Sequence, residues 1–188
     1  VGGPQTLPIP NLDTFDLAGS STTRAARRAA LNDMYQPVPD PVHAAAVNTF
    51  QTIDLLNTIN FAGYQPTGGA VYPTNGFGTS MKSVAALLKA QVGVEAVAID
   101  VNGWDTHSNQ GVVTGTMANL MSNLALTLAA FYADLNSGAV QPSFVLTAMS
   151  EFGRRVAQNG SAGTDHGHGN VMLVMGQAIT GGRVLANW

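Results

Sequence analysis

The residues best suited to chemistry gather in two short polar clusters and in one segment between them. The clusters read Gly-Trp-Asp-Thr-His at 103–107 and Gly-Thr-Asp-His-Gly-His-Gly at 163–169, and together they hold three of the four histidines. Between them, Ser-Glu-Phe-Gly-Arg at 150–154 contains one of the few glutamates of the chain. Mixed imidazole and carboxylate ligands are typical of Zn²⁺, Mn²⁺ or Fe, whereas Ca²⁺ and Mg²⁺ prefer oxygen ligands alone. The sequence therefore predicts a metal site built from Asp105, His107, Glu151, Asp165, His166 and His168.

The arginines beside Glu151 suggest what such a site would act on. A bound metal can activate water and offset charge on a phosphoryl or sulfuryl oxygen. Arg154 or Arg155 could hold the same anion through two parallel hydrogen bonds, and we take Arg154 as the candidate catalytic residue. Each residue also has a structural interpretation. Asp105 could form a turn with its own backbone, Glu151 could cap a turn, and the arginines could be solvated; His43 has no polar companions and is interpreted as structural.

Two apolar segments are expected to position these clusters. Residues 94–101 are mostly apolar and β-branched and come before Asp105, and residues 143–149 form a second apolar run before Glu151. Between them, residues 114–135 carry apolar side chains at helical spacing. Strand, helix and strand in this order predict the α/β class, with a mostly parallel sheet flanked by helices. Since the carboxyl ends of parallel strands lie at one edge, we expect the clusters to meet there.

The remaining elements are expected to complete a single domain. Residues 1–23 are rich in Pro, Gly, Ser and Thr and predict an irregular N-terminal arm, followed by one α/β domain over residues 24–188. We further expect helices over 23–35, from 41 to Gly63 and from 79 to Gly93, a third strand over 171–175, an irregular loop over 157–170 and a final strand over 183–188.

The composition excludes several classes of protein. Among 188 residues only 10% are charged and the net charge is −3, so no global field favours a nucleic-acid partner. The apolar content of 45% is too high for an intrinsically disordered chain. No apolar run reaches the roughly 18–20 residues that span a bilayer, so no transmembrane segment is expected. The absence of cysteine excludes disulfides, thiolate metal sites and a cysteine nucleophile.

Several motifs resemble a bacterial family called domain of unknown function 1501, and the resemblance covers about residues 24–188. That family is similar to the alkaline phosphatase and sulfatase superfamily, which has an α/β fold with paired metal sites at the strand ends. The motifs follow one another in the order that the family has, and they are Gly-Trp-Asp-Thr-His at 103–107, Ser-Glu-Phe-Gly-Arg at 150–154, Asn159-Gly160, Gly-Thr-Asp-His-Gly-His-Gly-Asn at 163–170, Met175-Gly176 and Gly-Gly-Arg-Val at 181–184.

The resemblance implies a role for each of the predicted ligands. Asp105 and His107 resemble the Asp and His that supply one metal after a central strand. Glu151 stands where the superfamily usually has an Asp for the second metal. The late histidine that completes the first site would be His166 or His168.

A second alignment, which places residues 165–167 on the Asp-His-Gly signature of the superfamily, stays open beside the first. Either alignment implies a metal-dependent hydrolase of phosphate or sulfate esters. The implied substrate is a small anionic ester, and the implied cofactor is a divalent metal, Zn or Mn. Export of family members implies a periplasmic or extracellular location.

The chain also departs from the superfamily. The superfamily has its first metal-binding Asp and its Ser, Thr or modified-Cys nucleophile on an N-terminal strand and the adjoining helix. In this chain, no apolar strand bearing an Asp precedes residue 40. We therefore expect an incomplete fold, the C-terminal portion of a longer protein, with Thr79 and Ser80 as the nearest spare hydroxyls. The alternatives are an inactive remnant, or a non-catalytic surface or assembly protein with a structural metal. The expected protein partners of the chain are the missing N-terminal part of the same protein or another copy of the chain.

Overall fold

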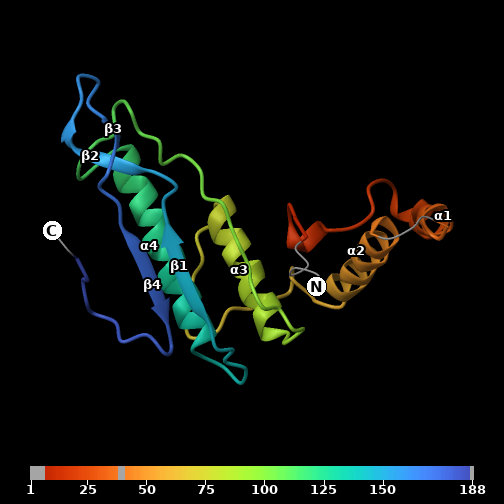
Figure 1. Ribbon diagram of the computed structural model, residues 1–188. Helices are drawn as coiled ribbons and strands as arrows, with labels where there is room; N and C mark the ends of the chain where they lie inside the picture. The colour runs from red at the N-terminus through yellow and green to blue at the C-terminus, as the bar shows by residue number, and fades with distance from the viewer. Residues whose placement is uncertain (1–6, 38–40, 187–188) are drawn as a thin grey trace. The chain divides into compact units, whose positions relative to one another are not determined.

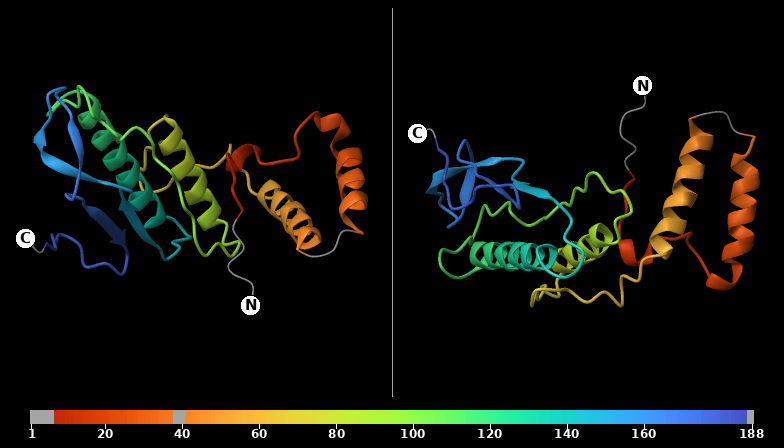
Figure 2. Two further views of the ribbon diagram at one scale, coloured as in Figure 1. Left: turned by 45° about the horizontal axis from the view of Figure 1, so that its top comes forward. Right: turned by 90° about the horizontal axis from the view of Figure 1, so that it is seen from below.

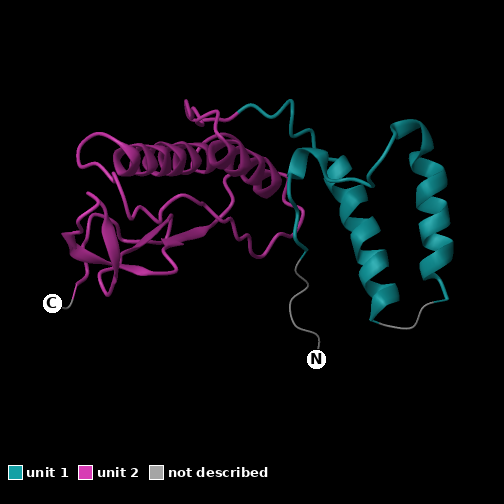
Figure 3. Ribbon diagram, turned by 90° about the horizontal axis from the view of Figure 1, so that it is seen from above, with its two compact units in different colours: residues 1–65 teal, residues 66–188 magenta. Residues whose placement is uncertain are grey.

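The computed structural model describes residues 7–37 and 41–186. The chain divides into two compact units, Val1–Gln65 and Pro66–Trp188, which Figure 3 shows in separate colours. Within the described residues there are four α-helices, two short 3-10 turns and four short strands (Figure 1). The predicted boundaries of the arm and of the domain over residues 24–188 stay a prediction, and residues 1–6 of the arm lie outside the described residues.

The first unit contains two helices that pack against each other (Figure 2). They are α1 (Arg24–Tyr35) and α2 (Val42–Asn57), which confirm two of the predicted helices. The apolar stripe of α2 is buried, with Phe50, Ile53 and Leu56 at its centre. Before α1, the described part of the arm is irregular except for 3-10 turns at Leu12–Thr14 and Ser21–Thr23.

An exposed ion pair joins these two helices. Arg28 of α1 binds both carboxylate oxygens of Asp54 on α2, with 2.6 Å between Arg28 Nη2 and Asp54 Oδ2. The Arg28 guanidinium also lies 5.1 Å from the centre of the Phe50 ring. This hydrogen bond holds the pKa of Asp54 below its ordinary value and raises that of Arg28. The pair therefore connects α1 to α2 by charge as well as by packing.

The second unit is built on the helices α3 (Gly76–Lys89) and α4 (Thr116–Leu135). Both were predicted from their apolar spacing, although α3 begins earlier than expected because the Asn75 side chain accepts a hydrogen bond from the Gly78 N–H and caps the helix there. The helices pack against each other, and their buried apolar residues form the core of this unit. These residues are Met81, Val84, Ala85, Ala86 and Leu87 of α3 and Ala130, Phe131 and Leu135 of α4.

A buried charged network ties α3 and α4 to the loop before them. The Asp134 side chain is 0% exposed, and its Oδ1 lies 2.8 Å from Lys89 Nζ. The Tyr72 hydroxyl donates to Asp134 Oδ2 over 3.0 Å, and the Thr67 N–H donates to Asp134 Oδ1 over 2.9 Å. Because this carboxylate of α4 receives two donors from the loop and one from α3, Asp134 fixes the loop against both helices.

The strands form two separate antiparallel pairs. The strand β1 (Val145–Met149) pairs with β4 (Met172–Gly176), and β2 (Gly153–Gln158) pairs with β3 (Thr164–Gly167). Strands β1 and β4 confirm the apolar strands predicted near 143–149 and 171–175. The pair β2–β3 occupies a stretch in which we expected an irregular loop over residues 157–170.

The expected α/β fold with a mostly parallel sheet flanked by helices is wrong for the described residues. The chain passes from β1 to β4 through the β2–β3 hairpin rather than through a crossover helix, so it reverses and the pair is antiparallel. Residues 94–101 run without strand pairing, and residues 95–98 within them are exposed. Helix α4 therefore does not connect two strands of one sheet. Residues 183–186 also form no strand, and residues 187–188 lie outside the described part.

The β1–β4 pair keeps apolar side chains in solvent. Val145 is 63% exposed and Met149 is 68% exposed, and Met172 opposite Met149 is 55% exposed. This sheet is therefore not the doubly covered sheet that the apolar strand sequences suggested. Among the described residues, no helix combines the length and the apolar character needed to cross a membrane.

Candidate metal centre

Backbone contacts bring the two polar clusters together in the second unit. The loop of residues 102–108 runs beside the β2–β3 hairpin, and the Thr164 N–H donates to the Thr106 carbonyl over 3.2 Å. A β-bridge also joins Ser108 to Ala162. At Gly163 the two backbones are so close that a Cβ would collide with the His107 carbonyl. The loop and the hairpin therefore form one local platform for the side chains of both clusters.

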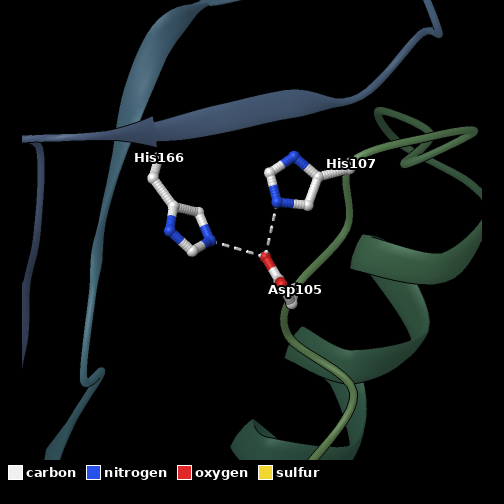
Figure 4. Close-up of side chains that lie close together, drawn as sticks. All are labelled: Asp105, His107 and His166. Atoms are coloured by element: carbon white, nitrogen blue, oxygen red, sulfur yellow. Dashed lines mark hydrogen bonds and ion pairs between the residues drawn. The ribbon is translucent and has the colours of Figure 1, made fainter.

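Three side chains converge on this platform (Figure 4). Asp105 and His107 come from the 102–108 loop and His166 comes from β3. Asp105 Oδ1 lies 3.0 Å from His107 Nε2 and 2.8 Å from His166 Nε2. One ligand atom from each residue lies within 4.8 Å of the others, so a single ion could touch all three. The three side chains are about half exposed, at 47–54%, which leaves the group open to solvent.

Arg154 forms an ion pair with the carboxylate of Asp105. Its Nη2 is 2.8 Å from Asp105 Oδ1 and 2.7 Å from the Trp104 carbonyl oxygen, and its Nη1 donates to the Thr164 carbonyl. The Arg154 side chain is only 17% exposed. These donors are directed at atoms of the protein, so Arg154 ties the hairpin to the loop. Its predicted catalytic role as an anion ligand stays a prediction.

Asp165 lies on the opposite side of the His107 ring from Asp105. Its Oδ1 is 3.1 Å from His107 Nδ1, and the Asn159 side-chain amide donates to the same oxygen over 2.8 Å. The Asn159 amide also donates to the His107 carbonyl over 2.9 Å. Asp165 therefore contacts the ring nitrogen that does not face the convergent group.

Both carboxylates are held in their charged form. The pKa of Asp105 lies below its ordinary value, first because of the hydrogen bond from His166 and then because of positive charge on His107, His166 and Arg154. The pKa of Asp165 is also lowered, first by the hydrogen bond from Asn159 and then by that from His107. A carboxylate must be deprotonated to bind a metal, so the surroundings of Asp105 favour the form that binds.

The other predicted ligands lie outside this group. Glu151 and His168 are exposed, and among residues 7–37 and 41–186 the ligand atoms within reach of one ion come from Asp105, His107 and His166 alone. For Glu151 and His168, a role as direct ligands stays a prediction.

Two residues beside the group were missed as site residues. The Phe152 ring stacks on the His166 ring at 4.5 Å with 8° between the planes, and the Arg154 guanidinium lies 5.0 Å from the Phe152 centre. The other is Asn159, which the sequence presents only as part of the Asn159-Gly160 motif. The spacing of residues does not reveal stacking. However, an aromatic residue between Glu151 and Arg154 was a signal that could have pointed to Phe152.

Comparison with known proteins gives a family but no function. Neither the curated proteins nor the solved structures include a significant match to the chain. The family model described as protein of unknown function DUF1501 matches residues 13–188. Because this match covers most of the sequence, and because it includes the loop and the hairpin that carry the convergent side chains, the chain belongs to the DUF1501 family.

Proposed function

We propose that Asp105, His107 and His166 bind one divalent transition metal, Zn²⁺ or Mn²⁺, in a centre that hydrolyses small phosphate or sulfate esters. The observation that carries the proposal is the convergence of their ligand atoms within 4.8 Å. Asp105 can serve both Arg154 and a metal, because a carboxylate offers about four lone pairs on two oxygens. Two imidazoles and one carboxylate are also a ligand set that catalytic zinc sites use.

The contacts of His107 support a cation at the same place. Its Nε2 faces Asp105 Oδ1 at 3.0 Å and its Nδ1 faces Asp165 Oδ1 at 3.1 Å. A neutral imidazole has only one N–H, so it can donate to only one of these two oxygens. Either an added proton or a metal on Nε2 makes both contacts favourable. A metal would also account for the nearby Nε2 of His166.

The exposure of the group suits catalysis better than burial would. Three protein ligands leave at least one coordination position for water or substrate, and the half-exposed side chains leave that position accessible. A bound metal there would supply activation of water and neutralisation of ester oxygens. In the reaction, water adds to phosphorus or sulfur, the ester bond breaks, and the alcohol leaves with a proton. The choice of these esters follows the resemblance to the alkaline phosphatase and sulfatase superfamily.

Metal analysis tests the binding site. Protein purified without chelator and then loaded should retain about one equivalent of Zn²⁺ or Mn²⁺ per chain, as expected for one three-ligand site. His107→Ala should lose this metal because it removes a ligand. His168→Ala is the matched control, since His168 is an exposed histidine that directly follows β3 and lies outside the group. Retention below about a tenth of an equivalent by the unaltered chain would count against the site.

Activity measurements test the reaction. The loaded protein should cleave an aryl phosphate or an aryl sulfate, and both His107→Ala and removal of the metal by a chelator should abolish cleavage. Return of activity after metal is added back to the unaltered chain would complete the argument. If neither ester is cleaved by protein that holds a full equivalent of metal, the hydrolase proposal is wrong although the binding site stands.

One observation favours a second candidate, a non-catalytic scaffold with a structural metal. The group joins the 102–108 loop to the hairpin, and Arg154 directs its donors at Trp104, Asp105 and Thr164 rather than into solvent. A metal in such a protein would raise the thermal unfolding midpoint without any hydrolysis. Cleavage of an aryl ester that depends on His107 would exclude this candidate.

A further inference from the structure

The two nitrogens of His107 face different carboxylates. Nε2 points at Asp105 within the convergent group, whereas Nδ1 lies 3.1 Å from Asp165 Oδ1 on the other side of the ring. The two nitrogens lie on different sides of a rigid five-membered ring, so Asp165 contacts the nitrogen that the proposed metal would not use. The geometry thus separates the two aspartates into an inner partner and an outer partner of the same histidine.

Asp165 is itself held in place by a side chain with a fixed orientation. The Asn159 amide donates to Asp165 Oδ1 over 2.8 Å and to the His107 carbonyl over 2.9 Å. The Asn159 carbonyl oxygen accepts from the Ser161 N–H at 2.9 Å and the Gly163 N–H at 3.0 Å. All four contacts use the amide with the same assignment of nitrogen and oxygen. The turn of the hairpin therefore supports Asp165 against the His107 ring.

We propose that Asp165 is a positioning residue of the metal centre, which acts through His107 rather than as a direct ligand. This inference rests on the proposed metal site. Asp165 accepts the N–H on Nδ1, which fixes the ring orientation and leaves the lone pair of Nε2 for the metal. Histidine ligands commonly donate their second N–H to a carboxylate in this way, and loss of such a partner typically weakens metal binding 10–100-fold.

Competition titrations with Zn²⁺ on the full chain test the inference. Asp165→Ala should weaken binding by about 10–100-fold. Asp165→Asn keeps the shape and the acceptor oxygen but removes the charge, so it should weaken binding by about tenfold, at the lower end of that range. The matched control is Asp100→Ala, which removes an exposed aspartate outside the group and should leave affinity unchanged. Circular dichroism shows whether each variant is folded. If Asp165→Ala does not fold, the affinity of Asp165→Asn tests the inference.

The spectrum of bound Co²⁺ separates positioning from direct binding. If Asp165 acts through His107, the Asp165 variants keep the same set of ligand atoms, so the visible absorption bands keep their position and intensity once the site is saturated. A direct ligand would change the coordination and shift the bands, which would overturn the inference. The inference also fails if Asp165→Ala binds Zn²⁺ as tightly as the unaltered chain while His107→Ala loses it, and the proposed metal site then still stands. If His107→Ala itself binds normally, the proposed site fails.

Discussion

Gly163 lies where the backbone of the hairpin passes close to the loop that carries His107. A Cβ at this position would collide with the carbonyl carbon and oxygen of His107, which are backbone atoms and cannot move aside as a flexible side chain can. Gly163→Ala should therefore separate the loop from the hairpin. We expect a loss of about 1–3 kcal/mol in the free energy of unfolding, as for other overpacked sites.

The matched control for this prediction is Gly160→Ala in the same turn. A Cβ at Gly160 meets nothing within 4 Å, so its effect should stay within about 0.5 kcal/mol. Urea denaturation of both variants measures the difference, and metal titration of Gly163→Ala should show weaker binding because His107 moves. Equal stability of the two variants would mean that the close approach at Gly163 is not maintained in solution.

At the scale of residues, the sequence predicted the convergent side chains but could not choose among the candidates. Asp105, His107 and His166 were all within the predicted set, because rare imidazoles and carboxylates in a chain with 10% charged residues are informative by type alone. The sequence does not determine which ring nitrogen faces which carboxylate. It therefore could not separate His166 from His168, or reveal that Asp165 contacts the far side of His107.

Between elements, the buried pair of Lys89 and Asp134 connects α3 to α4. Lys89 Nζ lies 2.8 Å from Asp134 Oδ1, and their side chains are 11% and 0% exposed. Asp134→Ala would leave the Lys89 ammonium in a poorly solvated place, so we expect a loss of about 3–5 kcal/mol in the free energy of unfolding. The double variant Lys89→Met with Asp134→Ala should lose less free energy of unfolding than the sum of the losses in Lys89→Met and in Asp134→Ala. Urea denaturation of the whole cycle measures this coupling, and additive effects would contradict it.

The exposed pair of Arg28 and Asp54 predicts how pH affects the contact of α1 with α2. The pKa of Asp54 is lowered in the folded chain by its hydrogen bond from Arg28, so the pair stabilises the fold above the unfolded pKa of about 3.9. That contribution is lost as the pH falls through the folded pKa. The raised pKa of Arg28 would matter only at strongly alkaline pH.

Thermal unfolding of Asp54→Asn and of the unaltered chain, measured from neutral pH to about pH 2.5, tests this dependence. The unaltered chain should have the higher midpoint at neutral pH, and the difference should shrink below about pH 4. Arg28→Gln should behave in the same way because it removes the other half of the pair. If the difference between the two midpoints stays constant down to the lowest pH, the ion pair of Asp54 with Arg28 does not stabilise the fold.

Elements differ in how well the sequence predicts them. Helices α1 to α4 depend on local spacing of apolar residues, and each was predicted, with α3 displaced by the Asn75 cap. Strand pairing depends on residues far apart in sequence, so β1 and β4 were found as strands but their antiparallel pairing was not. The β2–β3 hairpin is rich in glycine, so its sequence resembles that of a loop. Its strand pairing is also irregular between Arg154 and Gln158.

At the scale of the whole molecule, binding of the proposed metal should stabilise one unit only. All three proposed ligands belong to the unit Pro66–Trp188, and none belongs to Val1–Gln65. A ligand at 100 times its Kd stabilises the state that binds it by about 2.7 kcal/mol. Hydrogen exchange of the 102–108 loop and of the hairpin should therefore slow by up to about 100-fold with Zn²⁺. Amides of α1 and α2 should exchange at the same rate with and without metal.

His107→Ala is the control for this experiment, since it should remove the protection by Zn²⁺ and leave exchange in α1 and α2 unaltered. Mass spectrometry of peptic peptides gives the exchange rate of each segment. Slowing confined to α1 and α2, or slowing that persists in His107→Ala, would place the bound ion elsewhere in the chain.

The position of Trp104 gives the proposed centre an optical signal of its own. Its indole is half-buried, its carbonyl accepts from Arg154 at 2.7 Å, and Asp105 follows it directly in the chain. The sequence contains one other tryptophan, Trp188, which lies outside the described residues and can be replaced by phenylalanine. Fluorescence emission from Trp104 alone would then report whether the proposed metal site is occupied. Quenching by a paramagnetic ion such as Co²⁺ could be followed in real time by stopped-flow fluorescence, without any dye or substrate.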